Sequence, residues 1–172
     1  MKEPVVVVIG DYQPAKRAYS GEIVIVANDH GVYNVVQNAA QGIYRGKVVE
    51  VNDLDLEAAC SLVKRRKVKT DIVVLSLPAI GLNARLFIRG CVEGFPDTKF
   101  MFVSSNGGSL KEEALNLGVF SYLQAPVDIA EMKRAIASTL LSATPDEARR
   151  LYEQAELAAN VGCQCAGRLA RL

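Results

Sequence analysis

The residues of this chain that could do chemistry follow short apolar runs. Ser76 ends the run DIVVLS, Ser104 ends the run KFMFVS, and Asn28-Asp29-His30 follows EIVIVA. A serine beside the one histidine of the chain could begin a hydrolytic site, with Ser76 as nucleophile and His30 as base. The sequence shows neither an acid that would orient the histidine nor an oxyanion hole, so we expect no catalytic residues.

Five apolar runs rich in β-branched residues would position these side chains. The runs cover residues 22–29, 47–51, 71–77, 99–105 and 120–123, and apolar residues recur at helical spacing between them. Strands that alternate with helices through short connections predict a parallel sheet with helices on both faces. The functional crevice of such a sheet lies at the carboxyl ends of its strands, so the residues named above should meet at one edge.

The chain divides into three parts. Residues 1–21 contain the run VVVVIG and predict a strand or hairpin extension, and residues 22–141 form the α/β domain. Residues 144–172 predict an amphipathic helix that begins with Pro in its first turn. Steps of four and three residues along this helix form an apolar seam: Leu151, Ala155, Ala158, Gly162, Cys165, Leu169 and Leu172. The spacing leaves open whether the seam packs on the domain or on a second copy of the chain.

Charge and hydropathy exclude several classes of function. The 172 residues carry a net charge of +1, so no global field would draw the protein to nucleic acid or to an anionic membrane. The basic residues 64–67 end a predicted helix, where the helix dipole favours cations without any nucleic-acid site. No uncharged apolar run approaches the ~20 residues of a transmembrane helix, and residues 5–9 are too few for a secretory signal. We expect a cytoplasmic protein that binds neither nucleic acid nor membrane.

The four cysteines do not predict a metal centre. Cys60 and Cys91 fall on apolar helix faces, which is typical of core thiols. Cys163 and Cys165 are separated by one residue and have no second pair, so they do not match a zinc site and are expected to be small helical residues. We therefore expect no metal and no cofactor.

Several stretches of the domain resemble a known family. DIVVLSL followed by Pro78 is similar to the third strand of the receiver domains of response regulators, and PDTKFMFVSS is similar to their fourth strand. Residues 114–123 match the family's helix, glycine and aromatic run, and residues 122–127 match its Tyr-Leu-x-Lys-Pro-hydrophobic signature except at the lysine. The resemblance covers residues 22–141. It implies a flavodoxin-like (CheY-like) α/β fold, to which this chain adds an N-terminal strand and a C-terminal helix.

The residues that carry the phosphorylation chemistry of receiver domains are replaced here. The resemblance places Ser76 at the phospho-acceptor position, Ala125 at the lysine position, and Ala27, Asn28 and Asp29 at or beside the acidic positions that hold magnesium. An aspartyl phosphate needs a carboxylate nucleophile, oxygen ligands for magnesium, and a fixed cation against the phosphoryl oxygens. The resemblance therefore implies that the phosphorylation site is absent.

Two family positions are kept, the hydroxyl position at Ser104 and the aromatic switch position at Tyr122. These features predict a pseudo-receiver, a phosphorylation-independent regulatory module that is not an enzyme and acts by protein–protein contact. The expected contact surfaces are the 110–141 face and the 144–172 helix. Their partner is another protein or a second copy in a homodimer. Weak phosphorylation at a non-standard residue stays open as an alternative.

A second family offers a different ligand. Cobalamin-binding domains share this type of sheet and carry an Asp-x-His-x-x-Gly motif after the first strand, with the histidine bound to cobalt. His30 stands near that position, and Gly107-Gly108 is similar to a later element of the family. Asn28 replaces the aspartate that would orient the histidine, and Tyr33 stands in place of the glycine. Cobalamin binding by His30 is therefore the alternative hypothesis.

Overall fold

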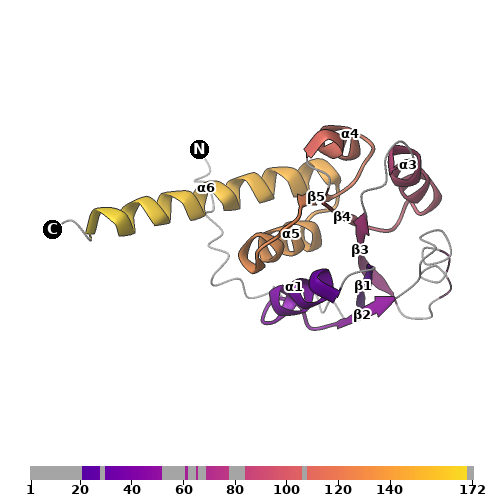
Figure 1. The fold of residues 1–172 in the computed structure, drawn as a ribbon, viewed down its shortest axis with the longest axis horizontal. Coiled ribbons are helices and arrows are strands. Elements are labelled where there is room, and N and C mark those ends of the chain that lie inside the picture. The colour runs from indigo at the N-terminus through magenta and orange to yellow at the C-terminus, as the bar shows by residue number, and fades with distance from the viewer. Residues whose placement is uncertain are drawn as a thin grey trace.

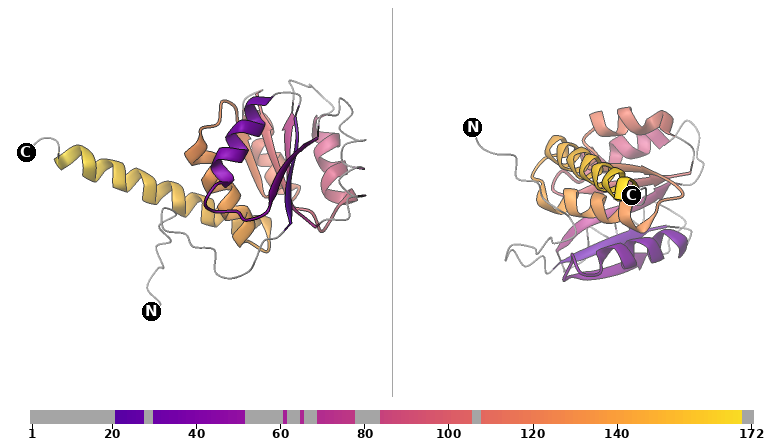
Figure 2. Two further views of the ribbon diagram at one scale, coloured as in Figure 1. Left: turned by 90° about the horizontal axis from the view of Figure 1, so that it is seen from below. Right: turned by 90° about the vertical axis from the view of Figure 1, so that its left-hand side faces the viewer.

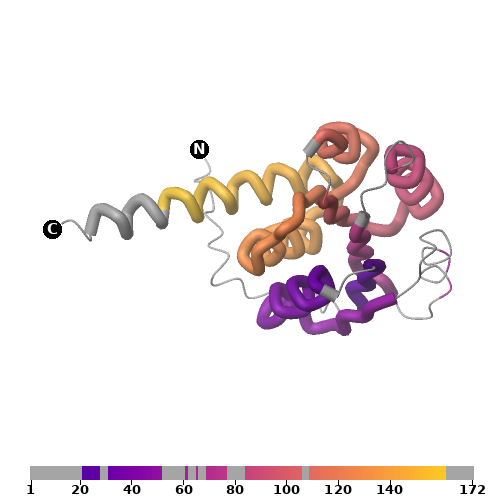
Figure 3. The backbone as a smooth tube through the Cα atoms, in the orientation of Figure 1, coloured from indigo at the N-terminus to yellow at the C-terminus, as the bar shows by residue number. Residues whose placement is uncertain are grey.

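A five-stranded parallel sheet forms the centre of the molecule (Figure 1). The computed structural model describes residues 21–27, 30–51, 61, 65, 69–77, 84–105 and 108–169, without the side chains of His30, Leu77 and residues 162–169. The strands lie in the order β2-β1-β3-β4-β5 (Figure 3). Their bounds are β1 Glu22–Val26, β2 Lys47–Val51, β3 Thr70–Leu77, β4 Phe100–Ser104 and β5 Ser121–Gln124.

The described helices lie on both faces of this sheet. They are α1 (His30–Ala40), α3 (Ala84–Gly94), α4 (Lys111–Asn116), α5 (Ile129–Leu141) and α6 (Pro145–Leu169), and a 3-10 turn, Gly108–Leu110, precedes α4. The predicted flavodoxin-like fold is confirmed. The predicted strand in residues 5–10 lies outside the described residues, as does most of the segment between β2 and β3, of which Ser61 and Arg65 are described as helical.

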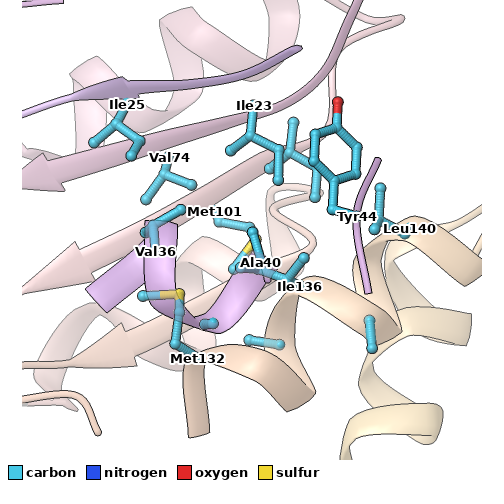
Figure 4. Close-up of a cluster of buried hydrophobic side chains, with 14 of the residues drawn as sticks. Ile23, Ile25, Val36, Ala40, Tyr44, Val74, Met101, Met132, Ile136 and Leu140 are labelled. Carbon is cyan, nitrogen blue, oxygen red and sulfur yellow. The ribbon is translucent and has the colours of Figure 1, made fainter. Parts of the chain in front are cut away.

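Alternation along the strands divides the core into two layers. On one face, β1, β3 and β4 contribute Ile25, Val74 and Met101, which pack against Val36 of α1 and Ile136 of α5 (Figure 4). On the other face, the intervening strand residues pack against α3, α4 and the residues that flank α4: Val24, Val73, Leu75, Phe100, Phe102, Ile88, Cys91, Ala114 and Val119. The expected core position of the Cys91 thiol is confirmed. Strands buried on both faces explain the continuous apolar runs in the sequence.

A buried polar pair lies at the amino ends of the strands. The Tyr44 hydroxyl donates a hydrogen bond of 2.9 Å to the carboxylate of Asp71, which is 8% exposed. Burial raises the pKa of Tyr44, and the adjacent Asp71 raises it further, so the phenol keeps the proton that it donates. The bond compensates the desolvation of a carboxylate at the start of β3.

The last helix, α6, packs on the domain over its first half. Two reciprocal hydrogen bonds cap its start. Thr144 Oγ1 accepts a hydrogen bond from the Glu147 N–H (3.3 Å), and the Glu147 carboxylate accepts one from the Ala143 N–H (2.8 Å). Ala148 and Ala155 are buried, whereas residues 156–161 are all exposed. Figures 1 and 2 show the second half of α6 extending away from the other described elements. Among the described residues, no helix combines the length and apolar character needed to cross a membrane.

Candidate functional site

Ala27 and Ser76 lie side by side at the carboxyl ends of two neighbouring strands. Val26 and Leu75 are register partners in the parallel β1–β3 ladder. Ala27 follows Val26, and Ser76 follows Leu75. Ser76 comes two residues after Val74, so its side chain points to the same face, where Ala27 also packs. The positions that the resemblance assigns to a magnesium ligand and to the phospho-acceptor are therefore adjacent in the fold.

Ala125 approaches the same face from the end of β5. Its N–H donates to the Ser104 carbonyl oxygen (2.8 Å), and its methyl group packs against the cluster that contains Ala27. The Ala125–Pro126 peptide bond is cis. Three predicted site positions thus converge on one side of the strand ends, although none of them carries a charge.

Ala27, Ser76 and Ala125 carry none of the charged groups that aspartyl phosphorylation uses. Ala27 and Ala125 present methyl groups, which neither coordinate a cation nor neutralise a phosphoryl group. Ser76 is half-buried and offers a hydroxyl where a carboxylate nucleophile is needed. Within the described parts of the chain, no group of three or more histidine, cysteine, aspartate or glutamate side chains is placed to hold a metal ion.

Several predicted site residues lie outside the described residues. Asn28, Asp29 and Gly107 are not described, and His30 is described only as the backbone that begins α1. Cobalamin binding and a contribution of Asp29 to a cation site therefore stay predictions. Of the basic residues 64–67, the structure describes Arg65, which is exposed.

Ser104 and Tyr122 lie on the opposite face of the sheet. Ser104 ends β4 and is 3% exposed, and Tyr122 packs beside Phe102, its register partner. The Tyr122 hydroxyl is buried and has no hydrogen-bond partner among the described residues. The aromatic switch position is therefore filled by a ring that points into the core.

The first half of α6 lies against the 110–141 face. Tyr152 donates a 3.4 Å hydrogen bond to Glu131 of α5, and Arg149 forms a 3.6 Å ion pair with Glu112 of α4. Burial raises the pKa of Glu131, and it raises the pKa of the Tyr152 hydroxyl to about 12. The surface that we expected to receive a partner is thus partly covered by the chain's own helix.

The contact of α6 with α4 and β5 is incompletely packed. A cavity of about 160 Å³ lies between these three elements and is lined in part by Leu115, Tyr122, Arg149, Tyr152 and Glu156. The contact of α6 with α5 is closer, because the buried residues Ala148 and Ala155 bring the two backbones together. The sequence left open whether this helix packs on the domain or on a second copy; its first half packs on the domain, and α5 supplies most of that contact.

Lys99 fixes the connection between α5 and α6. Its amine donates to the carbonyl oxygens of Thr139 (2.9 Å) and Ser142 (2.6 Å) and lies 5.4 Å from the Phe120 ring centroid. Burial lowers the pKa of this amine, and the carbonyl oxygens at the α5 C-terminus compensate for its lost hydration. Lys99, Glu131 and Tyr152 were not predicted from the sequence. The signal for Tyr152 was its place four residues after Ala148 on one helix face.

Several solved structures have the same architecture. A response regulator from Thermotoga maritima superposes with a TM-score of 0.57 at 18% sequence identity, over 72% of this chain and 99% of that chain. The fold is that of a receiver domain. The N-terminal signal receiver domain of a two-component response regulator from Bacteroides fragilis gives 0.54 at 19% identity, over 74% and 96% of the two chains. An orphan response regulator of H. pylori also gives 0.54 at 19% identity, over 70% and 97%.

The sequence comparisons gave no match. No protein-family model matches the chain, and no curated protein matches it. The receiver fold is thus evident from the arrangement of the strands and helices.

Proposed function

We propose that this chain is a receiver-like regulatory module that acts by protein contact and does not depend on aspartyl phosphorylation. One observation supports the proposal above all: Ala27, Ser76 and Ala125 lie together on one face of the strand ends. That face therefore offers two methyl groups and a hydroxyl where a cation ligand, a carboxylate and an amine would be needed. Regulation without phosphotransfer leaves the surfaces of the domain and of α6 as the means of transmission. The module is expected to have no catalytic activity.

Intact-mass spectrometry after incubation with acetyl phosphate and magnesium tests the first part of this proposal. The wild-type mass is expected to stay unchanged. The triple variant Asn28→Asp, Ser76→Asp, Ala125→Lys is expected to gain the mass of one phosphoryl group, because it restores the carboxylate nucleophile, a second carboxylate and the cation at the positions that the resemblance assigns to them.

A matched control places the new carboxylate one strand away. Ser105 is exposed at the end of β4, and the variant Asn28→Asp, Ser105→Asp, Ala125→Lys should gain no phosphoryl group. Phosphorylation of the wild-type chain would contradict the proposal. Equal labelling of both triple variants would show that Ser76 does not occupy the acceptor position.

A further inference from the structure

The cavity between α4, β5 and α6 has the size of a small ring molecule. Its volume of about 160 Å³ is close to the ~150 Å³ of a cavity that accommodates benzene. Leu115, Phe120 and Tyr152 contribute apolar surface to its lining. A planar ring would therefore fill the space that remains between α6 and the domain.

The outer edge of β5 forms one wall of this cavity. Residues 120–123, which include most of the strand, all line it. Phe120 donates its N–H to the Phe100 carbonyl oxygen (3.0 Å), so its polar backbone groups point toward β4. Backbone groups alternate in direction along a strand, and those of Ser121 and Leu123 therefore point away from β4. Because β5 is the last strand in the sheet order, these groups have no partner strand among the described residues.

The polar groups at this wall are buried. Ser121 is 9% exposed and Leu123 is 3% exposed. A buried backbone N–H or C=O without a partner costs free energy comparable to that of a lost hydrogen bond. Tyr122 also lines the cavity, and its buried hydroxyl has no hydrogen-bond partner among the described residues. A molecule that offers both a donor and an acceptor would satisfy such an edge, as an added strand does in peptide recognition.

The charged residues around the cavity favour a neutral ligand over an anion. Three glutamates line it, Glu112, Glu153 and Glu156, against the two cations Lys111 and Arg149. Arg149 is already paired with Glu112 (3.6 Å) and with Glu153 (3.2 Å). A carboxylate placed here would meet more negative than positive charge.

We propose that this cavity is a binding site for a small neutral aromatic amide. The amide carbonyl oxygen would accept a hydrogen bond from the Leu123 N–H, and the amide N–H would donate to the Ser121 carbonyl oxygen. These two backbone groups are neighbours on one edge of the strand, which matches the adjacent acceptor and donor of a primary amide. The ring would lie against Leu115, Phe120 and Tyr152. The inference goes beyond the proposed function, because it assigns a small-molecule ligand to the contact between α6 and the domain.

Titration of the isotopically labelled full chain with benzamide, followed by NMR, tests the proposal. A Kd of roughly 1 mM is expected for a ligand of this size. The largest changes in chemical shift should occur at the Leu123 amide proton and the Ser121 carbonyl carbon. N,N-Dimethylbenzamide keeps the ring and the carbonyl group but has no N–H donor, so it should bind about tenfold more weakly. Benzoate should also bind more weakly than benzamide, because it is an anion.

Two leucine substitutions near α4 locate the site. Leu115→Phe places a larger side chain in the cavity and should weaken benzamide binding at least about tenfold. Leu110→Phe is the matched control, because Leu110 is half-buried on the same side of the sheet but is not among the residues that line the cavity. This control should bind benzamide as the wild type does. Thermal unfolding of both variants establishes that they are folded.

The ligand series keeps the proposal testable even where a variant does not fold. Unchanged Leu123 and Ser121 signals at about 10 mM benzamide would overturn the proposal. Equal affinities for benzamide and N,N-dimethylbenzamide would overturn the role of the β5 edge, and equal affinities of the wild type and a folded Leu115→Phe variant would place the ligand elsewhere. A phosphoryl group found on the wild-type chain would contradict the proposed function and leave this titration unaffected.

Discussion

At the carboxyl ends of the strands, two alanines and one serine occupy positions that decide what the fold can do. The backbone brings Ala27 level with Ser76 and places Ala125 on the same side of the sheet. Side chains this short leave the edge without a charged group at these three positions. A receiver fold with such an edge keeps its rigid frame and its surfaces, and these are the parts that contact other proteins.

Replacement of tyrosine by phenylalanine is predicted to have opposite effects on the free energy of unfolding at two buried positions. The Tyr122 hydroxyl has no hydrogen-bond partner among the described residues, so Tyr122→Phe should raise the free energy of unfolding by about 1 kcal/mol. The Tyr44 hydroxyl donates to buried Asp71, so Tyr44→Phe should lower that free energy by about 1–3 kcal/mol. Urea denaturation of the two variants and the wild type measures both changes.

The half-buried residue Tyr33 provides the control, and Tyr33→Phe should change the free energy of unfolding by less than either of the other variants. A loss of stability in the Tyr122→Phe variant would mean that this hydroxyl has a partner. That outcome would favour a water-mediated bond to the cavity beside α6.

The positions of the site could be predicted from the sequence, but their environments could not. The run DIVVLSL placed Ser76 at a strand end because a buried strand has a recognisable composition. Nothing in the sequence near Tyr44 points to Asp71, which is 27 residues away, or distinguishes a paired hydroxyl from the unpaired one of Tyr122. Hydrogen bonds between distant elements depend on the packing of the whole sheet.

At the scale of the elements, α5 and α6 form a helical hairpin. Lys99, the residue before β4, holds the segment that connects the two helices. Lys99 donates to backbone carbonyl oxygens of Thr139 and Ser142, which α5 leaves unpaired at its C-terminal end. The side chains of Thr144 and Glu147 accept hydrogen bonds from backbone N–H groups at the start of α6. The direction in which α6 leaves the domain is therefore determined by a small number of polar contacts.

Lys99→Met should lower the free energy of unfolding by about 1–3 kcal/mol, because carbonyl oxygens at the end of α5 lose a charged donor. Chemical denaturation measures this change. Hydrogen exchange of residues 139–148 should also become faster in the variant. The same substitution at exposed Lys111 of α4 serves as the control and should alter neither property. Equal effects of both substitutions would show that Lys99 does not secure the connection.

The elements themselves were predictable because strands and helices have distinct periods. The order and type of the described strands follow from the sequence, and the fifth strand was displaced by one residue. The seam of α6 was seen in the sequence, but its division into a docked half and a projecting half was not. That division depends on the dimensions of α5 and β5, against which α6 ends its contact at Ala155.

At the scale of the whole molecule, the described residues form a packed domain and a helix, α6, whose buried residues Ala148 and Ala155 both lie in its first half. Ending the chain after Ala155 should leave the thermal midpoint within about 2 °C of the wild type at low micromolar concentration. Ending it after Ser142 should lower the midpoint by more than about 4 °C, because the faces of α5 and β5 that contact Ala148, Tyr152 and Ala155 become exposed. Differential scanning calorimetry compares the three chains. Equal midpoints for both truncations would show that the first half of α6 does not stabilise the domain.

The projecting helix also gives the molecule a mechanical property. The whole of α6, from Pro145 to Leu169, is a rod of about 38 Å, and a rotation of ~10° at the Lys99 connection would displace its tip by roughly 6–7 Å. A displacement of that size at the tip corresponds to a much smaller shift between α5 and α6 near their connection. Lys99, which joins β4 to the end of α5, therefore lies at the pivot of α6. A small loosening of the domain at this point would produce a larger displacement at the far end of the helix.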